Sequence, residues 1–220
     1  MDRAVLSQRI TGIIGDLNHL TNTLYSLNMT DIQRFPENYE VLSIDAAHRA
    51  EVVACRLRHL IYQSTSVKKE EYLETAADVQ DIEINCRDGI VEITLPCLIP
   101  GKKKWKSCEF LLDPFNAALH RYAEEHTMPQ FRHCVICFSH VYGRDNADRR
   151  VRDYDNLELK KYLDMAASYI LTDDTGLLCD AYQTTELGER DCTRISIMDS
   201  LRFPKWLDER QAALRSIEDL

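Results

Sequence analysis

The chain has 220 residues, a formal net charge of −9, and a composition of 45% hydrophobic and 29% charged residues. With only seven Gly and six Pro, it is typical of a globular protein, which excludes a collagen-like or low-complexity chain. No stretch approaches the roughly 18 uninterrupted apolar residues of a transmembrane helix, and the first residues lack the apolar core of a secretory signal. We therefore expect a cytoplasmic protein with reduced cysteines and no membrane partner.

Two apolar stripes with helical spacing occupy residues 1–64. The first alternates steps of four and three residues: Leu6, Ile10, Ile13, Leu17, Leu20, Leu24 and Leu27. The second has small side chains that permit close approach of a partner helix: Ala47, Ala50, Ala54, Leu57 and Ile61. Together the stripes predict an antiparallel helical hairpin. With a short charged helix near residues 68–77, it forms a first domain over residues 1–78.

From Asp81 onward the apolar residues follow the two-residue period of strands. Asp88-Gly89 is typical of a tight turn and predicts a hairpin around it. Asp113-Pro114 predicts the start of a helix, because a capping carboxylate precedes a proline suited to the first helical position. Residues 133–142 form a β-rich run, which we interpret as a central strand.

A helix, two strands and a terminal helix complete the chain. The spacing predicts a helix over 159–170 and strands near 177–185 and 193–198, with Gly188 in the turn between these strands and a last helix from near Pro204. The order β-β-α-β-α-β-β predicts an α+β domain over residues 79–220, with a mixed sheet covered by helices.

Positive charge is concentrated in the middle of this acidic chain. Residues 100–161 hold 12 basic and 9 acidic side chains, whereas the whole chain holds 27 and 36. Two basic clusters stand out, which are Lys102, Lys103, Lys104 and Lys106, then Arg144, Arg149, Arg150 and Arg152. The net charge disfavours avid nucleic-acid binding, but these clusters favour local contact with phosphates.

Four carboxylates flank the helix predicted over 159–170. Asp153 and Asp155 precede it, and Asp173 and Asp174 follow it. Carboxylates that converge on one point suit Mg²⁺ or Mn²⁺, which activates water near a phosphoryl group. The two pairs would lie about 25 Å apart along a straight helix, so they meet only if the chain folds back or a second subunit supplies one pair. A helix cap and an ordinary turn would also explain these residues.

The string Arg152-Asp153-Tyr154-Asp155-Asn156-Leu157, followed by a helix and an Asp-Asp pair, resembles the signature of the RusA-like Holliday junction resolvases, or crossover junction endodeoxyribonucleases. Glu92-Ile93-Thr94-Leu95-Pro96 resembles the opening strand of that family, and the later elements follow in matching order. The resemblance covers residues 82–199, a little over half of the chain.

The resemblance implies a homodimeric, Mg²⁺- or Mn²⁺-dependent endonuclease that nicks four-way or related branched DNA in recombination and repair. It assigns catalysis to Asp153, Asp155 and Asp174, adds Asp173 as a metal ligand, and implies that each site draws on both subunits. The two basic clusters, with Lys160 and Lys161, would contact the DNA backbone. A prokaryotic source follows, with a prophage or another mobile element as the family's frequent setting.

Two other functions fit the same residues. A non-catalytic descendant of this fold would bind nucleic acid or protein, with the carboxylates of Asp153, Asp155 and Asp174 splayed apart. A dominant role of the helical hairpin would instead make this an assembly protein. Cys134 and Cys137 have the spacing of a zinc or redox motif, but residues three apart in a strand lie on opposite faces, so we interpret them as buried thiols.

Overall fold

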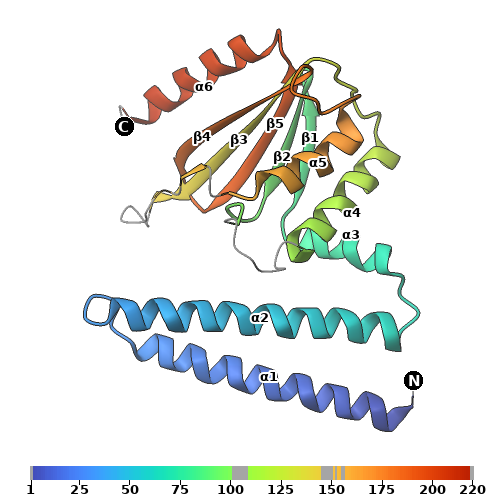
Figure 1. Cartoon of the computed structure of the whole chain (residues 1–220), viewed down its shortest axis with the longest axis vertical. Helices are drawn as coiled ribbons and strands as arrows, with labels where there is room; N and C mark the ends of the chain where they lie inside the picture. The colour runs from blue at the N-terminus through green and yellow to red at the C-terminus, as the bar shows by residue number, and fades with distance from the viewer. Residues whose placement is uncertain (1, 101–108, 145–150, 152, 155–156, 219–220) are drawn as a thin grey trace. The chain divides into compact units, whose positions relative to one another are not determined.

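The computed structural model describes residues 2–100, 109–144, 151, 153–154 and 157–218. The chain divides into two compact units, Met1–Tyr72 and Leu73–Leu220 (Figure 1). The first unit is a helical hairpin, and the second holds a five-stranded mixed sheet with helices. The chain therefore has the predicted α+β class, with helices at its N-terminus. No helix among the described residues is long and apolar enough to cross a bilayer.

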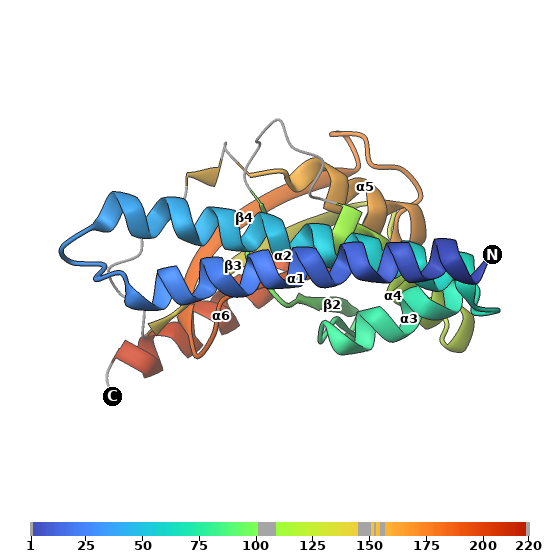
Figure 2. The same ribbon diagram turned by 90° about the horizontal axis from the view of Figure 1, so that it is seen from below.

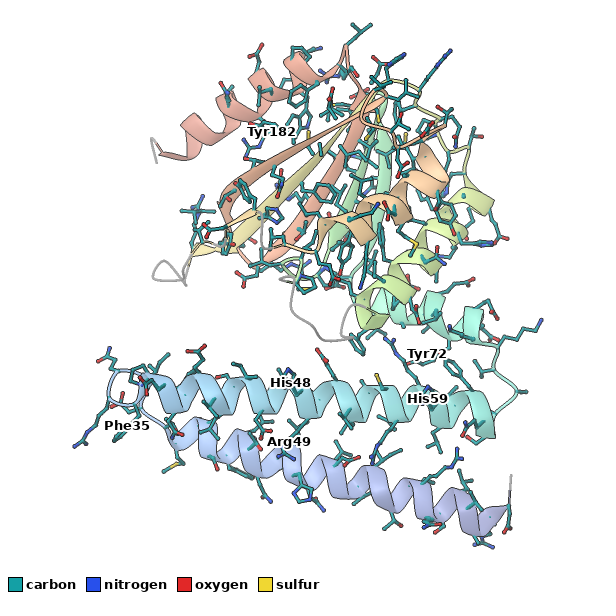
Figure 3. The ribbon with its side chains drawn as sticks, viewed as in Figure 1. Phe35, His48, Arg49, His59, Tyr72 and Tyr182 are labelled. Atoms are coloured by element: carbon teal, nitrogen blue, oxygen red, sulfur yellow. The ribbon has the colours of Figure 1, made fainter. Side chains whose placement is uncertain are left out.

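The hairpin consists of α1 (Arg3–Met29) and α2 (Pro36–Ser64), which run side by side (Figure 2). Two polar contacts join them: Arg56 Nη1 donates to Asp16 Oδ2 at 2.5 Å, and Thr23 Oγ1 donates to Asp45 Oδ2 at 3.0 Å. Asp45 also accepts a bond from Arg49 Nε at 2.7 Å, and Figure 3 shows Arg49 between the two helices. The predicted antiparallel helical hairpin is confirmed.

The residues buried within the hairpin differ from the predicted stripes. In α1, Ile13 is buried, whereas Ile10, Leu17 and Leu24 of the same stripe are exposed. In α2 the buried apolar residues are Ala46 and Val53, and the predicted Ala47, Ala50 and Leu57 are exposed. Ala54 and Ile61 of the predicted stripe are half-buried, so the stripe predicted for α2 was wrong for the other three residues. Apolar side chains lie on several sides of α2, and spacing alone does not say which side meets α1.

The boundary between the two units, after Tyr72, falls within α3 (Lys69–Val79). A β-hairpin follows this helix. Strands β1 (Glu83–Arg87) and β2 (Ile90–Leu95) pair antiparallel through a two-residue turn. Both turn residues have positive φ, 52° at Asp88 and 74° at Gly89, which is the backbone of a type I′ turn. The turn predicted from Asp-Gly is confirmed.

Five strands form one sheet in the order β1-β2-β5-β3-β4. β3 (Cys134–Gly143) pairs parallel with β4 (Cys179–Gly188) and antiparallel with β5 (Cys192–Asp199), which also pairs antiparallel with β2. Every residue of β3 is buried, so the predicted interior strand is confirmed. Gly188 was predicted to lie in the turn after β4, but it is the last residue of that strand.

Helices cover the two faces of this sheet unequally (Figure 1). α4 (Glu109–Glu125) and α5 (Leu159–Ile170) pack on one face around the main core, in which Phe115, Phe138 and Tyr162 are fully buried. α6 (Phe203–Glu218) packs on the other face, where Phe203 and Trp206 cover a smaller cluster. Figure 3 shows Tyr182 on this side, and its ring centroid lies 5.3 Å from that of Phe203.

The start of α4 corrects a prediction. α4 already includes Glu109, so Pro114 lies inside the helix and Asp113 is not its cap. A proline cannot donate to the carbonyl four residues before it, which here belongs to Phe110. Gln80 Nε2 donates to that carbonyl instead, over a long 3.5 Å. This tertiary contact makes the interior proline tolerable.

Candidate functional site

We call residues 152–157, which precede α5, the motif segment. Two inward side chains, Tyr154 and Leu157, anchor it. Tyr154 Oη lies 2.7 Å from Thr185 Oγ1 of β4, and its ring centroid lies 5.5 Å from that of His140 on β3. Leu157 is 3% exposed within the main core, and its N–H donates to the Tyr154 carbonyl at 3.2 Å. These contacts hold the segment beside the last residues of β3 and β4. Asp153 is exposed there, whereas Arg152 and Asp155 lie outside the described residues.

Backbone and ionic contacts fix the start of α5. The N-cap residue of α5 is Glu158, and its side chain makes no cap bond. The cap therefore lies three residues after Asp155, which the sequence had suggested for it. The Glu158 N–H donates to the Pro100 carbonyl at 3.0 Å, and its carboxylate pairs with Lys161 at 2.8 Å. These contacts place the loop after β2 next to the motif segment.

The second acidic pair lies in the turn between α5 and β4. Asp173 Oδ1 accepts the backbone N–H of Thr175 at 3.1 Å, which is an Asx turn. Asp173 and Asp174 are both exposed. The turn interpretation of Asp173 is therefore confirmed, and its Oδ1 already has a local donor.

Asp153 and the Asp173-Asp174 turn lie near opposite ends of β4. Tyr154 contacts Thr185, whereas the turn with Asp174 leads into Cys179 at the other end of that strand. Six strand residues span about 20 Å. Asp164 and, more weakly, Asp174 raise the pKa of Lys160, which donates to Asp164 at 3.0 Å. The described residues contain no cluster of three potential metal ligands from His, Cys, Asp or Glu.

The predicted DNA-binding residues are only partly described. Lys102, Lys103, Lys104, Lys106, Arg149 and Arg150 lie outside the described residues, as Arg152 does. Arg144 is exposed directly after β3. Lys160 and Lys161 form ion pairs with Asp164 and Glu158, so a phosphate would compete with these carboxylates for both lysines.

The cysteine spacing does not form a joint site. Cys134 packs in the main core under α4 and α5, and Cys137 packs in the cluster under α6, so the two thiols lie on opposite faces of β3. Burial raises the pKa of each thiol to about 12. The interpretation as buried thiols is confirmed. His133 is exposed, and His140 is buried beside Tyr154.

Sequence reasoning missed a polar hollow on the α6 side of the sheet. Its volume is about 500 Å³, and residues of β2, β3, β4, β5 and α6 line it. Arg210 and Arg194 both pair with Glu186, at 3.4 and 3.5 Å, and Arg210 also donates to Thr184 at 2.6 Å. The sequence signal for this hollow was the alternation of polar residues such as Arg194 and Ser196 along β5. The strand order decides that they meet Glu186, which lies two strands away.

Comparisons with known proteins place the chain in a family but do not supply a function. A family of unknown function, DUF6100, matches residues 2–220, which include both compact units. No curated protein gave a significant match. Because the family match extends over nearly the whole sequence, this chain belongs to the DUF6100 family.

Proposed function

We propose that the protein is a metal-dependent endonuclease that acts on four-way or related branched DNA as a homodimer. The observation that carries the proposal is the anchoring of the motif segment, since Tyr154 and Leu157 hold exposed Asp153 at the end of the central strand. The element order from β1 to β5 also follows the order expected of a RusA-like domain.

The donor set suits a hard dication. Carboxylate oxygens are preferred ligands of Mg²⁺ and Mn²⁺, and an exposed position leaves room for water and a phosphate. In the proposal, Asp153 and Asp155 hold the ion and orient the attacking water toward the scissile phosphate. A bound ion would lower the pKa of that water and offset charge on the phosphate.

The third carboxylate of the proposed site comes from a second copy. Asp174 lies at the other end of β4 from the motif segment of its own chain, as described above. A site shared across a two-fold axis would bring the Asp174 of one copy to the Asp153 of the other. Exposed Arg144 and the lysines at 102–106 would contact phosphates, so binding should weaken steeply with added salt.

The test uses the purified chain and a labelled synthetic four-way junction. We expect nicking with Mg²⁺ or Mn²⁺ and none with EDTA. Asp155→Asn should lower the cleavage rate by about 100-fold or more while leaving junction binding intact, because only the transition state requires the ion. The matched control is Asp208→Asn, an exposed aspartate on α6, which should cut at the wild-type rate.

A mixing experiment tests whether the site is shared. Asp155→Asn and Asp174→Asn should each be inactive alone. Their heterodimer keeps one intact shared site, so random mixing should restore about a quarter of wild-type activity. If each chain held its own complete site, the mixture would stay inactive.

A non-catalytic binding module is the second candidate. The separation of Asp153 from Asp174 within one chain favours it, and so do the ion pairs that already engage Lys160 and Lys161. Salt-sensitive junction binding without cleavage under any divalent metal would support this function and refute the nuclease.

A further inference from the structure

One side of the helical hairpin carries exposed apolar residues from both helices. Ile10, Ile14, Leu17 and Leu24 of α1 are 40–51% exposed, and Leu57 of α2 is 42% exposed. Ala47 and Ala50 are exposed as well. We call this set of seven residues the apolar face.

Helix geometry places these residues on the same side. Leu17 follows buried Ile13 by four residues, and Leu57 follows buried Val53 by four. Each step of four residues turns the chain about 40° around the helix axis in the same sense. Because the two helices are antiparallel, this rotation moves both leucines toward one side of the hairpin.

The α1 part of the apolar face carries few charges. In α1 only Arg3, Arg9 and Asp16 are charged, and Asp16 is paired with Arg56. Two exposed charged residues continue the stripes of the apolar face, Arg3 seven residues before Ile10 and Glu40 seven before Ala47. A surface with this composition neither repels an apolar partner nor suits a strongly charged one.

We propose that a second copy of this chain covers the apolar face, so that two hairpins pack antiparallel into a four-helix bundle. The observations behind this inference belong to the hairpin alone, although the proposed nuclease also requires a homodimer. The exposed stripe Ile10, Ile14, Leu17 and Leu24 has the four-and-three spacing of helices packed in a left-handed bundle. Residue 17 is its midpoint, so a two-fold axis there would place Ile10 of each copy opposite the partner's Leu24.

The charged ends of the apolar face complement each other in this arrangement. The contacts of Asp16 with Arg56 and of Thr23 with Asp45 show which parts of α1 and α2 are level. By the same alignment Glu40 is level with about residue 30 of α1, roughly 20 Å beyond Leu17, and Arg3 lies a similar distance before it. An axis at Leu17 therefore brings each Arg3 level with the partner's Glu40, which places opposite charges together at each end of the bundle.

The available area is sufficient for a stable dimer. Two helices of about 40 Å, packed 8–10 Å apart, present a face of roughly 800 Å². Stable interfaces bury about 800 Å² on each partner. A second hairpin would therefore bury an interface of ordinary size.

The first experiment measures the molar mass of the full chain by light scattering after size exclusion. We expect twice the 25.5 kDa of one chain at micromolar concentration. Leu17→Glu should raise the dimer dissociation constant by about 100-fold or more, because the new carboxylate would be buried in the apolar seam. Val52→Glu is the matched control, since Val52 is similarly exposed at 45% but precedes buried Val53 by one residue and lies on the other side of α2.

A charge-reversal pair tests the antiparallel arrangement. Arg3→Glu or Glu40→Arg alone should weaken the dimer by up to about fivefold at low salt. The double variant should recover wild-type affinity. Failure of this recovery would overturn the antiparallel packing.

A photo-cross-linking amino acid in place of Leu17 identifies what covers the apolar face. We expect adducts between two chains that map to residues 10–24 or 47–57. A monomeric wild type would overturn the proposal, as would cross-links confined to residues 73–220 of the same chain.

Discussion

Two glycines shape the sheet for different reasons. Gly89 has a φ of 74°, which the two-residue turn before β2 requires. Gly188 has no such requirement, but a Cβ built on it would lie 2.5 Å from Cγ1 of Val141 on the neighbouring strand. A side chain at position 188 would therefore force β4 away from β3 at the end nearest the motif segment.

We expect Gly188→Ala to lower the free energy of unfolding by about 1–3 kcal/mol, as overpacking of a close contact usually does. The measurement is urea unfolding of the full chain, followed by far-UV circular dichroism. Gly176→Ala is the matched control, because a Cβ there would contact nothing within 4 Å. An equal loss in both variants would contradict the steric explanation.

At the scale of elements, an ion pair joins α3 to α4. Arg121 donates to both carboxylate oxygens of Asp78, at 2.5 and 3.0 Å. This hydrogen-bonded pairing lowers the pKa of Asp78 and raises that of Arg121. Both side chains remain partly exposed, so the contribution to stability is that of a surface pair with good geometry.

Asp78→Asn should cost up to about 1 kcal/mol of unfolding free energy near pH 7. The carboxyl has a lower pKa in the folded state than its ordinary 3.8, so the pair stabilises the fold above that value. This contribution is lost as the pH falls through the lowered folded pKa. The difference between wild type and variant in urea unfolding should therefore shrink in acid, and a double variant with Arg121→Ala should show that the two losses are not additive.

At the scale of the whole molecule, the two units bury very different amounts of apolar surface. The sheet unit contains the fully buried Phe115, Phe138, Tyr162, Ile195 and Ile197. The hairpin buries only three apolar side chains, which are Ile13, Ala46 and Val53. Because tertiary packing supplies most of the stability of a helix, we expect the hairpin to gain stability from the second copy proposed above.

Hydrogen exchange measures this difference directly. We expect the amides of β3 and β5 to exchange slowest, at a rate that does not depend on protein concentration. The amides of α1 should exchange faster and gain protection as the concentration rises through the dimer dissociation constant. Protection of α1 that is independent of concentration would contradict a stabilising role of the second copy.

Local chemistry in the sequence determined much of the fold. The Asp88-Gly89 turn, the interior strand at 134–143, helix α5 and the opposite faces of Cys134 and Cys137 all follow from short-range rules. These rules concern residues close together in the chain, where the allowed dihedral angles and the side-chain period leave few alternatives.

Only the tertiary structure decided which apolar stripe of α2 is buried, where α4 begins, and where Asp153 and the Asp173-Asp174 turn lie along β4. Each of these outcomes depends on a partner distant in the sequence: α1 for the stripe, Gln80 for the carbonyl freed by Pro114, and Thr185 for the motif segment. The polar hollow around Glu186 has the same origin, because hydrogen bonding between strands sets their order across the sheet. The spacing along one segment carries no information about which distant segment packs against it.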